Sequence, residues 1–309
     1  MKPDLLNKIL EKAKSESVVS AVALYNWTEP LLHPNLGALI REVKWHGISC
    51  IISSNLNTIK NLDEIIKSSP DHFRISLSGF TQEIYEQGHK GGNIEIVKCN
   101  MIELSKIIDL NKSNTVIEVF YHRYIYNSHE IDQMKEFSKS LGFKFSSILA
   151  QLYPVEKIIK IANGERTAED DIILPKLALP IEEAIEVSRQ SQGSSDCTLL
   201  EDVIAIDVNG NVVLCCGSSA DRSNSIGSFL DNSIDEIQKL RHRHSLCGEC
   251  YSLGIPTYFL GRDPAFEIIA SRRIESFVDQ RAGTRDAKPE LSDGEVRKHS
   301  DNIAAIARG

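Results

Sequence analysis

Apolar residues in the first half of the chain form short runs that alternate with segments of helical periodicity. Apolar positions at helical spacing after Pro3 predict a helix over residues 3–15. The next run, residues 18–25, is apolar and partly β-branched, which predicts a buried strand. The alternation continues, with further helices predicted at residues 35–46, 62–67, 94–110 and 130–141, and strands at 49–53, 73–77, 116–121 and 143–149.

This repeated helix–strand order predicts the fold class α/β, with parallel strands joined by right-handed crossovers. Because such strands are usually covered on both faces, we expect both faces of the sheet to be buried. Residues 156–193 show less regular helical periodicity, which is clearest over 178–190. Residues 264–280 fit one amphipathic helix, and the charged segment 282–309 is expected to be mobile.

A turn signal and a thiol stand together in the last third of the chain. Asn209-Gly210 separates two apolar runs, which predicts a hairpin with a two-residue loop. The returning strand of this hairpin would end at Cys215. Three further cysteines, Cys197, Cys247 and Cys250, lie before and after this hairpin. We expect them and Cys215 to be the four thiolate ligands of one soft metal centre, either an iron–sulfur cluster or zinc.

The remaining cysteines are expected to play other roles. Adjacent residues on a strand point to opposite faces, so Cys216 should not share a metal with Cys215. Cys50 lies in an apolar strand and Cys99 on a helix face, and both are expected in the core.

Composition restricts the classes of protein that remain. The chain has 309 residues, 41% hydrophobic and 25% charged, which suits a protein with a sizeable core. A formal net charge of −8 without a basic run argues against a nucleic-acid partner. No apolar stretch reaches the length of a membrane span, and no signal peptide is evident. Seven cysteines in such a chain favour a reducing cytoplasm.

Polar residues follow each predicted strand, including Glu29 after the first and Asn55 after the second. In parallel α/β folds, ligands bind beyond the carboxyl ends of the strands. Five such strand ends together predict a ligand cleft at this edge of the sheet.

These segments resemble those of a known superfamily. Residues 25–34, with Thr28-Glu29-Pro30, resemble the GEP segment of radical S-adenosylmethionine (radical SAM) enzymes. Residues 74–79 resemble their ribose-contact segment, and the cysteine pattern from Cys197 to Cys250 is similar to their C-terminal SPASM/twitch module. The resemblance implies a partial (β/α)6 radical SAM barrel that lacks its first strand, followed by a small hairpin-plus-helix cluster domain.

The same resemblance implies a cofactor site. Glu29 and the backbone nearby would face the amino group of S-adenosylmethionine, and the other residues its ribose or carboxylate. The implied cofactor-binding residues are Trp27, Thr28, Glu29, Asn55, Ser78 and Arg123. The family usually has glycine where this chain has Thr28. No catalytic residue is assigned.

One family motif is missing. Radical SAM enzymes carry a CxxxCxxC loop after their first strand, and the sequence contains none. We therefore expect one auxiliary [4Fe–4S] cluster here, with S-adenosylmethionine and a second [4Fe–4S] cluster only in an intact relative. The expected organisation is a partial barrel over 1–155, a helical connection over 156–193, the cluster domain over 194–260, and a helix and tail over 261–309.

Three functions stay open at this point. The first is a truncated, inactive form of a radical SAM oxidoreductase or modifying enzyme, acting on a small molecule or a peptide with an electron donor as partner. The second is a non-catalytic iron–sulfur or substrate-binding protein. The third is an α/β protein with a structural zinc knuckle.

Overall fold

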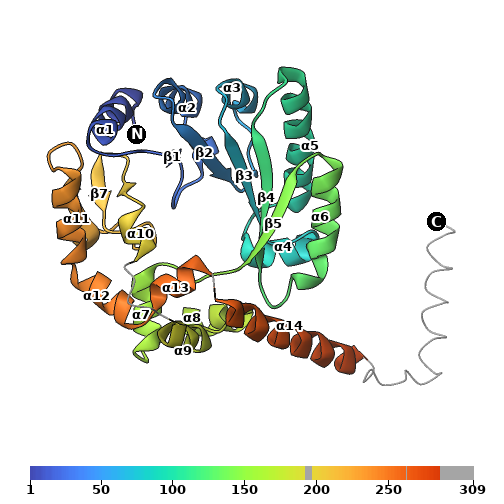
Figure 1. The fold of residues 1–309 in the computed structure, drawn as a ribbon. Helices are drawn as coiled ribbons and strands as arrows, with labels where there is room; N and C mark the ends of the chain where they lie inside the picture. The colour runs from blue at the N-terminus through green and yellow to red at the C-terminus, as the bar shows by residue number, and fades with distance from the viewer. Residues whose placement is uncertain (192–196, 262, 286–309) are drawn as a thin grey trace, which may run out of the picture.

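The computed structural model of the chain describes residues 1–191, 197–261 and 263–285 (Figure 1). These residues contain two β-sheets. The larger sheet has five parallel strands in the order β1-β2-β3-β4-β5, which confirms the predicted α/β fold. Its strands are β1 Ala21–Ala23, β2 Ser49–Ser54, β3 His72–Leu77, β4 Val116–Arg123 and β5 Lys144–Leu149.

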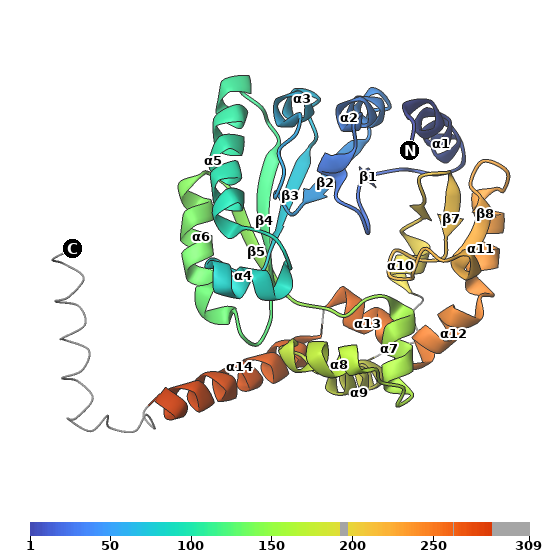
Figure 2. The ribbon, with the colours of Figure 1, turned by 180° about the vertical axis from the view of Figure 1, so that it is seen from behind.

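Crossover helices lie along the outer face of this sheet (Figures 1 and 2). They are α2 Leu36–Trp45, α3 Leu62–Lys67, α5 Ile94–Asn111 and α6 Ile131–Ser140, with the short α4 Gln82–Gly88, which the sequence pattern did not predict. The helices pack on buried strand residues such as Ile52, Phe73 and Val119, and together they form the main hydrophobic core. Helix α5 starts at an N-cap, because the Asn93 side chain accepts hydrogen bonds from two backbone N–H groups.

The inner face of the sheet is polar, so the expectation that both faces are buried was wrong. Side chains alternate between buried and partly buried along β2, β3 and the first seven residues of β4. The partly buried set includes Glu118, whose Oε2 lies 2.9 Å from His72 Nε2 and 3.6 Å from Arg74 Nε. The Arg74 guanidinium also lies 4.4 Å from the centre of the Phe120 ring. Helices therefore cover only one side of these strands.

The first strand is shorter and more exposed than its sequence predicts. Only three residues of β1 pair with β2, and Val18 is 99% exposed. The residues before β1 form the link from the first helix, so their apolar character does not bury them. Within the described residues, β1 pairs on one side only and forms an edge of the sheet.

The second half of the chain forms two smaller units. One is a helical core of α7 Val155–Ala162, α8 Ala168–Ile173, α9 Ile181–Ser191, α13 Ile255–Leu260 and α14 Pro264–Arg285. The other is an antiparallel sheet of β6 Ala205–Ile206, β7 Asn211–Val213 and β8 Ser225–Ser228, accompanied by α10 Thr198–Glu201, α11 Ile234–His242 and α12 Ser245–Ser252. Most of the predicted tail lies outside the described residues. No helix among the described residues is long and apolar enough to cross a membrane.

Helix α1, Pro3–Glu16, joins the two sheets because it buries two of its faces. Leu6 and Leu10 belong to the main core, whereas Ile9 packs with Val212 and other residues of the small sheet. The Glu16 carboxylate accepts a hydrogen bond of 2.7 Å from the backbone N–H at the start of α11. The small sheet is thereby held against the large one.

The predicted hairpin is present, but its loop is longer than two residues. Strands β6 and β7 pair through Ile206 and Val212, and Asp207 N–H donates to the Asn211 carbonyl. The turn between them closes with a bond from Gly210 N–H to the Asp207 carbonyl, and Gly210 has φ +89°. A turn followed by a left-handed glycine is the usual three-residue hairpin loop.

Substitution of Gly79 is expected to destabilise the large sheet. An alanine Cβ at Gly79 would lie 2.5 Å from Tyr85 N and 2.6 Å from Tyr85 Cα, which are backbone atoms of α4. We expect Gly79→Ala to lower the free energy of unfolding by about 1–3 kcal/mol. Gly248→Ala, in a helix with nothing within 4 Å of its Cβ, should instead raise it by up to about 1 kcal/mol. Urea unfolding of the metal-free chain measures both, and equal midpoints would contradict this packing argument.

Candidate functional site

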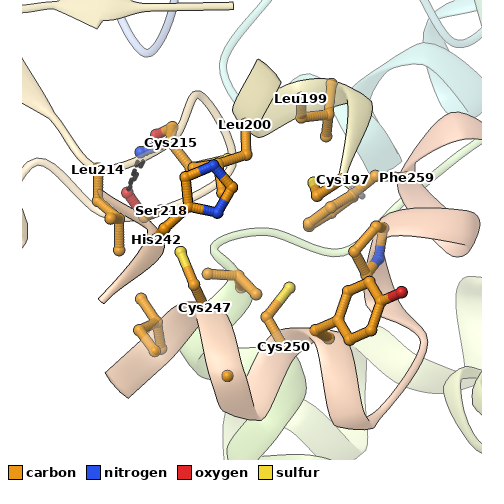
Figure 3. A pocket seen from close by; sticks show the side chains of 15 residues that line it. Cys197, Leu199, Leu200, Leu214, Cys215, Ser218, His242, Cys247, Cys250 and Phe259 are labelled. Carbon is orange, nitrogen blue, oxygen red and sulfur yellow. Dashed lines mark hydrogen bonds between the residues drawn. The ribbon is translucent and has the colours of Figure 1, made fainter. Parts of the chain in front are cut away.

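Four cysteines line one cavity of about 250 Å³, here called the four-thiol cavity (Figure 3). They are the predicted ligands Cys197, Cys215, Cys247 and Cys250. The first lies at the N-cap of α10, the second follows β7, and the last two lie on α12. Apolar side chains such as Leu200, Leu246 and Phe259 form much of the remaining wall. Three separate segments therefore deliver thiols to one largely apolar space.

Local sequence explains how α12 presents its thiols. Cys247 and Cys250 are three residues apart, and residues at that spacing share one face of a helix. The helix begins where the His244 side chain accepts a hydrogen bond from Leu246 N–H. The preceding α11 starts with a capping box formed by Ser233 and Glu236.

The thiols influence one another electrostatically. Burial and the neighbouring Cys215 raise the pKa of Cys247 to about 11, and burial also raises the pKa of Cys197 and Cys250. The pKa of Cys215 is lowered, because the Cys216 thiol donates a hydrogen bond to it and Gly217 N–H donates another at 3.3 Å. Several buried thiolates repel one another, and a bound cation would relieve that repulsion.

The donor set suits a soft metal centre, although the thiols are not gathered around a single point. In the part of the chain that the structure describes, no three His, Cys, Asp or Glu side chains are close enough to hold one metal ion. A tetrahedral zinc site needs bonds of about 2.3 Å to each sulfur. An iron–sulfur cluster holds its cysteines around several metal ions and so accepts more widely spaced ligands. Thiolates are the ligands that both centres prefer.

The expectation that Cys99 lies in the core was wrong, and the reason given for excluding Cys216 as a ligand does not hold. Cys99 is exposed on α5, whereas Cys50 is buried as expected. Strand alternation does not apply to Cys215 and Cys216, because β7 ends at Val213 and both cysteines follow it in a turn. Their thiols contact each other, but Cys216 does not line the four-thiol cavity.

A second cavity, of about 240 Å³, lies at the carboxyl ends of β1, β2 and β3 and is here called the strand-end cavity. Four of the six expected cofactor residues, Trp27, Thr28, Glu29 and Asn55, line it, together with Tyr25, Asn26, Ser53, Ser54 and Ser76. The Ser53 and Ser76 hydroxyls lie 3.1 Å apart on neighbouring strands.

Glu29 has a defined structural partner on each oxygen. Its Oε1 accepts from Leu31 N–H at 3.1 Å and so caps a short 3-10 helix, Pro30–Leu32. Its Oε2 accepts from Asn55 N–H at 2.9 Å, which joins the loop after β1 to the end of β2. A carboxylate has about four lone-pair sites, so it can still accept hydrogen bonds from a cation in the cavity.

The other two expected cofactor residues lie elsewhere. The Ser78 side chain is buried, and its Oγ lies 2.7 Å from Nδ1 of His89. Arg123 forms an ion pair with Glu267 on α14. Both side chains are engaged by other partners, and neither lines the strand-end cavity.

Solved structures with the same architecture identify the fold. The enzyme anSMEcpe with bound AdoMet matches with a TM-score of 0.51 and 13% identity, over 93% of this chain and 90% of its own. SuiB of Streptococcus suis bound to S-adenosylmethionine matches with a TM-score of 0.52 and 15% identity, over 83% of this chain and 64% of its own. The chain has the radical SAM fold. SuiB bound to its precursor peptide SuiA also matches, with a TM-score of 0.52 and 13% identity over 80% of this chain and 59% of its own. No protein-family model and no curated protein matches the sequence.

Three aromatic rings connect the two cavities of this radical SAM fold. The Trp27 ring, in the strand-end cavity, meets Tyr153 edge-on at 5.7 Å, and Tyr153 stacks on Phe259 of the four-thiol cavity at 4.8 Å. Gln151 fixes this aromatic bridge, because it accepts from the Tyr153 hydroxyl and donates to the Phe259 carbonyl. Local sequence patterns do not indicate this bridge, because neighbouring members are more than 100 residues apart in the chain.

Proposed function

We propose that the chain acts as a radical SAM-type modifying enzyme with one auxiliary [4Fe–4S] cluster. The observation that supports this proposal is that one radical SAM fold contains both a polar strand-end cavity and a four-thiol cavity. Bound S-adenosylmethionine and its reducing cluster would supply the radical that abstracts hydrogen from the substrate. The protein's own residues bind and orient these groups.

In this proposal the strand-end cavity takes S-adenosylmethionine. Glu29 supplies a carboxylate to the cofactor's ammonium group, and the serine hydroxyls of β2 and β3 offer further hydrogen bonds. Trp27 provides an apolar surface at the rim, since it is 48% exposed. Thr28 stands where the family usually has glycine, and it lines the strand-end cavity.

The four-thiol cavity takes the auxiliary cluster. Its apolar wall lowers solvent access, and the thiol of Cys216 and the N–H of Gly217 offer hydrogen bonds to the sulfur of Cys215. Hydrogen bonds to sulfur and solvent exposure set the potential of such clusters. The cysteines that would hold a second, reducing cluster are not among these 309 residues, because no CxxxCxxC occurs.

The substrate would lie against the aromatic bridge, between the two cavities. A peptide is the proposed class, supported by the likeness to SuiB with its bound precursor peptide. Tyr153, 39% exposed, and Trp27 present ring surface there, and aromatic rings contribute large contact area to peptide recognition.

Loss of the Glu29 charge is expected to weaken S-adenosylmethionine binding. A hydrogen bond between an ammonium and a carboxylate contributes more than a neutral one, so Glu29→Gln should raise the Kd roughly tenfold or more. Equilibrium dialysis with radiolabelled S-adenosylmethionine measures the Kd, and thermal unfolding checks that the loop survives. Glu83→Gln, an exposed residue on α4, is the matched control. Equal affinity of the two variants would remove Glu29 from the proposed site.

A further inference from the structure

Arg241 is the largest side chain with no exposed surface in the described residues, and it lies beside the four-thiol cavity. It sits at the end of α11, on the face that also buries Ile237. The neighbouring Arg243 is exposed to solvent. Burying a guanidinium is costly unless hydrogen bonds and an opposite charge compensate for its lost hydration.

Arg241 donates hydrogen bonds to backbone carbonyls of the two segments that carry Cys197 and Cys215. Its Nε donates to the Leu214 carbonyl at 2.9 Å, directly before Cys215. Its two terminal nitrogens donate to carbonyls of the segment after Cys197, with distances of 2.8 Å to Leu200, 2.8 Å to Val203 and 3.4 Å to Leu199. One further bond goes to the side-chain oxygen of Gln238 at 2.9 Å. One guanidinium thus fixes the two segments relative to each other.

The opposite charge does not come from a carboxylate. Among the described residues, no Asp or Glu forms an ion pair with Arg241. Burial lowers the pKa of Arg241, and the thiols of Cys215, Cys247, Cys216 and Cys197 oppose that shift. Arginine stays protonated even so. The groups near this buried cation that can carry negative charge are therefore the thiols.

We propose that Arg241 is the built-in counter-cation of the four-cysteine centre. It positions Cys197 and Cys215, and its charge balances the negative charge of a metal centre held by four thiolates. The inference rests on the proposed function, since it requires a metal centre in the four-thiol cavity. A nearby fixed positive charge favours the more negative, reduced form of a cluster, so Arg241 should raise the reduction potential.

The test compares Arg241→Gln and Arg241→Lys with Arg243→Gln as a matched surface control. Iron and acid-labile sulfide are measured for each reconstituted protein, and the midpoint potential is measured by redox titration followed by electron paramagnetic resonance. We expect Arg241→Gln to bind the cluster less tightly and to shift its potential to more negative values. Arg241→Lys, which keeps the charge, should stay close to the wild-type potential, and Arg243→Gln should be unchanged.

The outcomes separate the two proposals. A wild-type potential in cluster-loaded Arg241→Gln would overturn the counter-cation role, as would loss of the cluster from the Lys and Gln variants alike. If Arg241→Gln holds no cluster but Arg241→Lys does, the charge requirement is supported. If the wild-type chain contains zinc without sulfide, the proposed function fails. Arg241 is then tested by zinc release to a chelator, where Arg241→Gln should have roughly tenfold or more weaker affinity than Arg241→Lys.

Discussion

Anaerobically reconstituted protein is expected to hold about four iron and four sulfide ions per chain, bound by Cys197, Cys215, Cys247 and Cys250. These thiols line one cavity. The rest of its wall is largely apolar, and apolar side chains cannot replace a lost cysteine ligand. Serine at Cys215 or Cys250 should therefore reduce iron to trace levels. Iron and acid-labile sulfide analysis, with the visible absorbance of the cluster, gives the measurement.

Two cysteine variants serve as controls for this loss. Cys99→Ser should keep all of the iron, because Cys99 is exposed on α5. Cys216→Ser should keep most of it, because Cys216 does not line the four-thiol cavity. Equal loss in Cys215→Ser and Cys216→Ser would show that the ligand set is wrong. Stoichiometric zinc without sulfide would favour a structural zinc knuckle instead.

The 309-residue polypeptide is expected to release no 5′-deoxyadenosine from S-adenosylmethionine in the presence of dithionite. Reductive cleavage by radical SAM enzymes needs a cluster on three closely spaced thiolates, and the sequence has no CxxxCxxC. Weak cofactor binding should survive, because Trp27, Thr28, Glu29 and Asn55 still line the strand-end cavity. Chromatography of the reaction products detects 5′-deoxyadenosine with high sensitivity.

A fusion protein that regains the missing cysteine loop is the positive control for this experiment. A strand with a CxxxCxxC loop from a radical SAM enzyme, joined ahead of α1, could pair with the side of β1 that is unpaired in the described residues. Product from this fusion, and none from its triple-serine variant, is the expected result. Release of 5′-deoxyadenosine by the unfused chain would disprove the expectation.

Periodicity alone located most elements of the large sheet. The predicted strand 73–77 lies within β3, and the predicted helix 62–67 has the bounds of α3, because a buried strand and an amphipathic helix each need a fixed local pattern. The prediction failed where burial depends on distant partners. The apolar run at 18–25 gave only a three-residue strand, since β2 pairs with only part of it.

Cysteine spacing was similarly informative about the site. A hairpin and a CxxC helix are local structures, so the sequence could indicate which four thiols share a cavity. Four of the six residues expected at the cofactor site line the strand-end cavity. Ser78 instead lies against His89, and Arg123 forms an ion pair with Glu267. Glu267 lies on a helix far along the chain.

The sequence by itself predicted parallel strands, indicated which four cysteines line one cavity, and placed polar residues at the first two strand ends. Each depends on a pattern that repeats within a few residues. Only the tertiary structure decided that Arg241 is buried beside the thiols, that α1 joins the two sheets, and that Tyr153 connects the two cavities. These features depend on which distant segments meet, because the free energy of burying a charge or a ring is set by the neighbours that packing supplies.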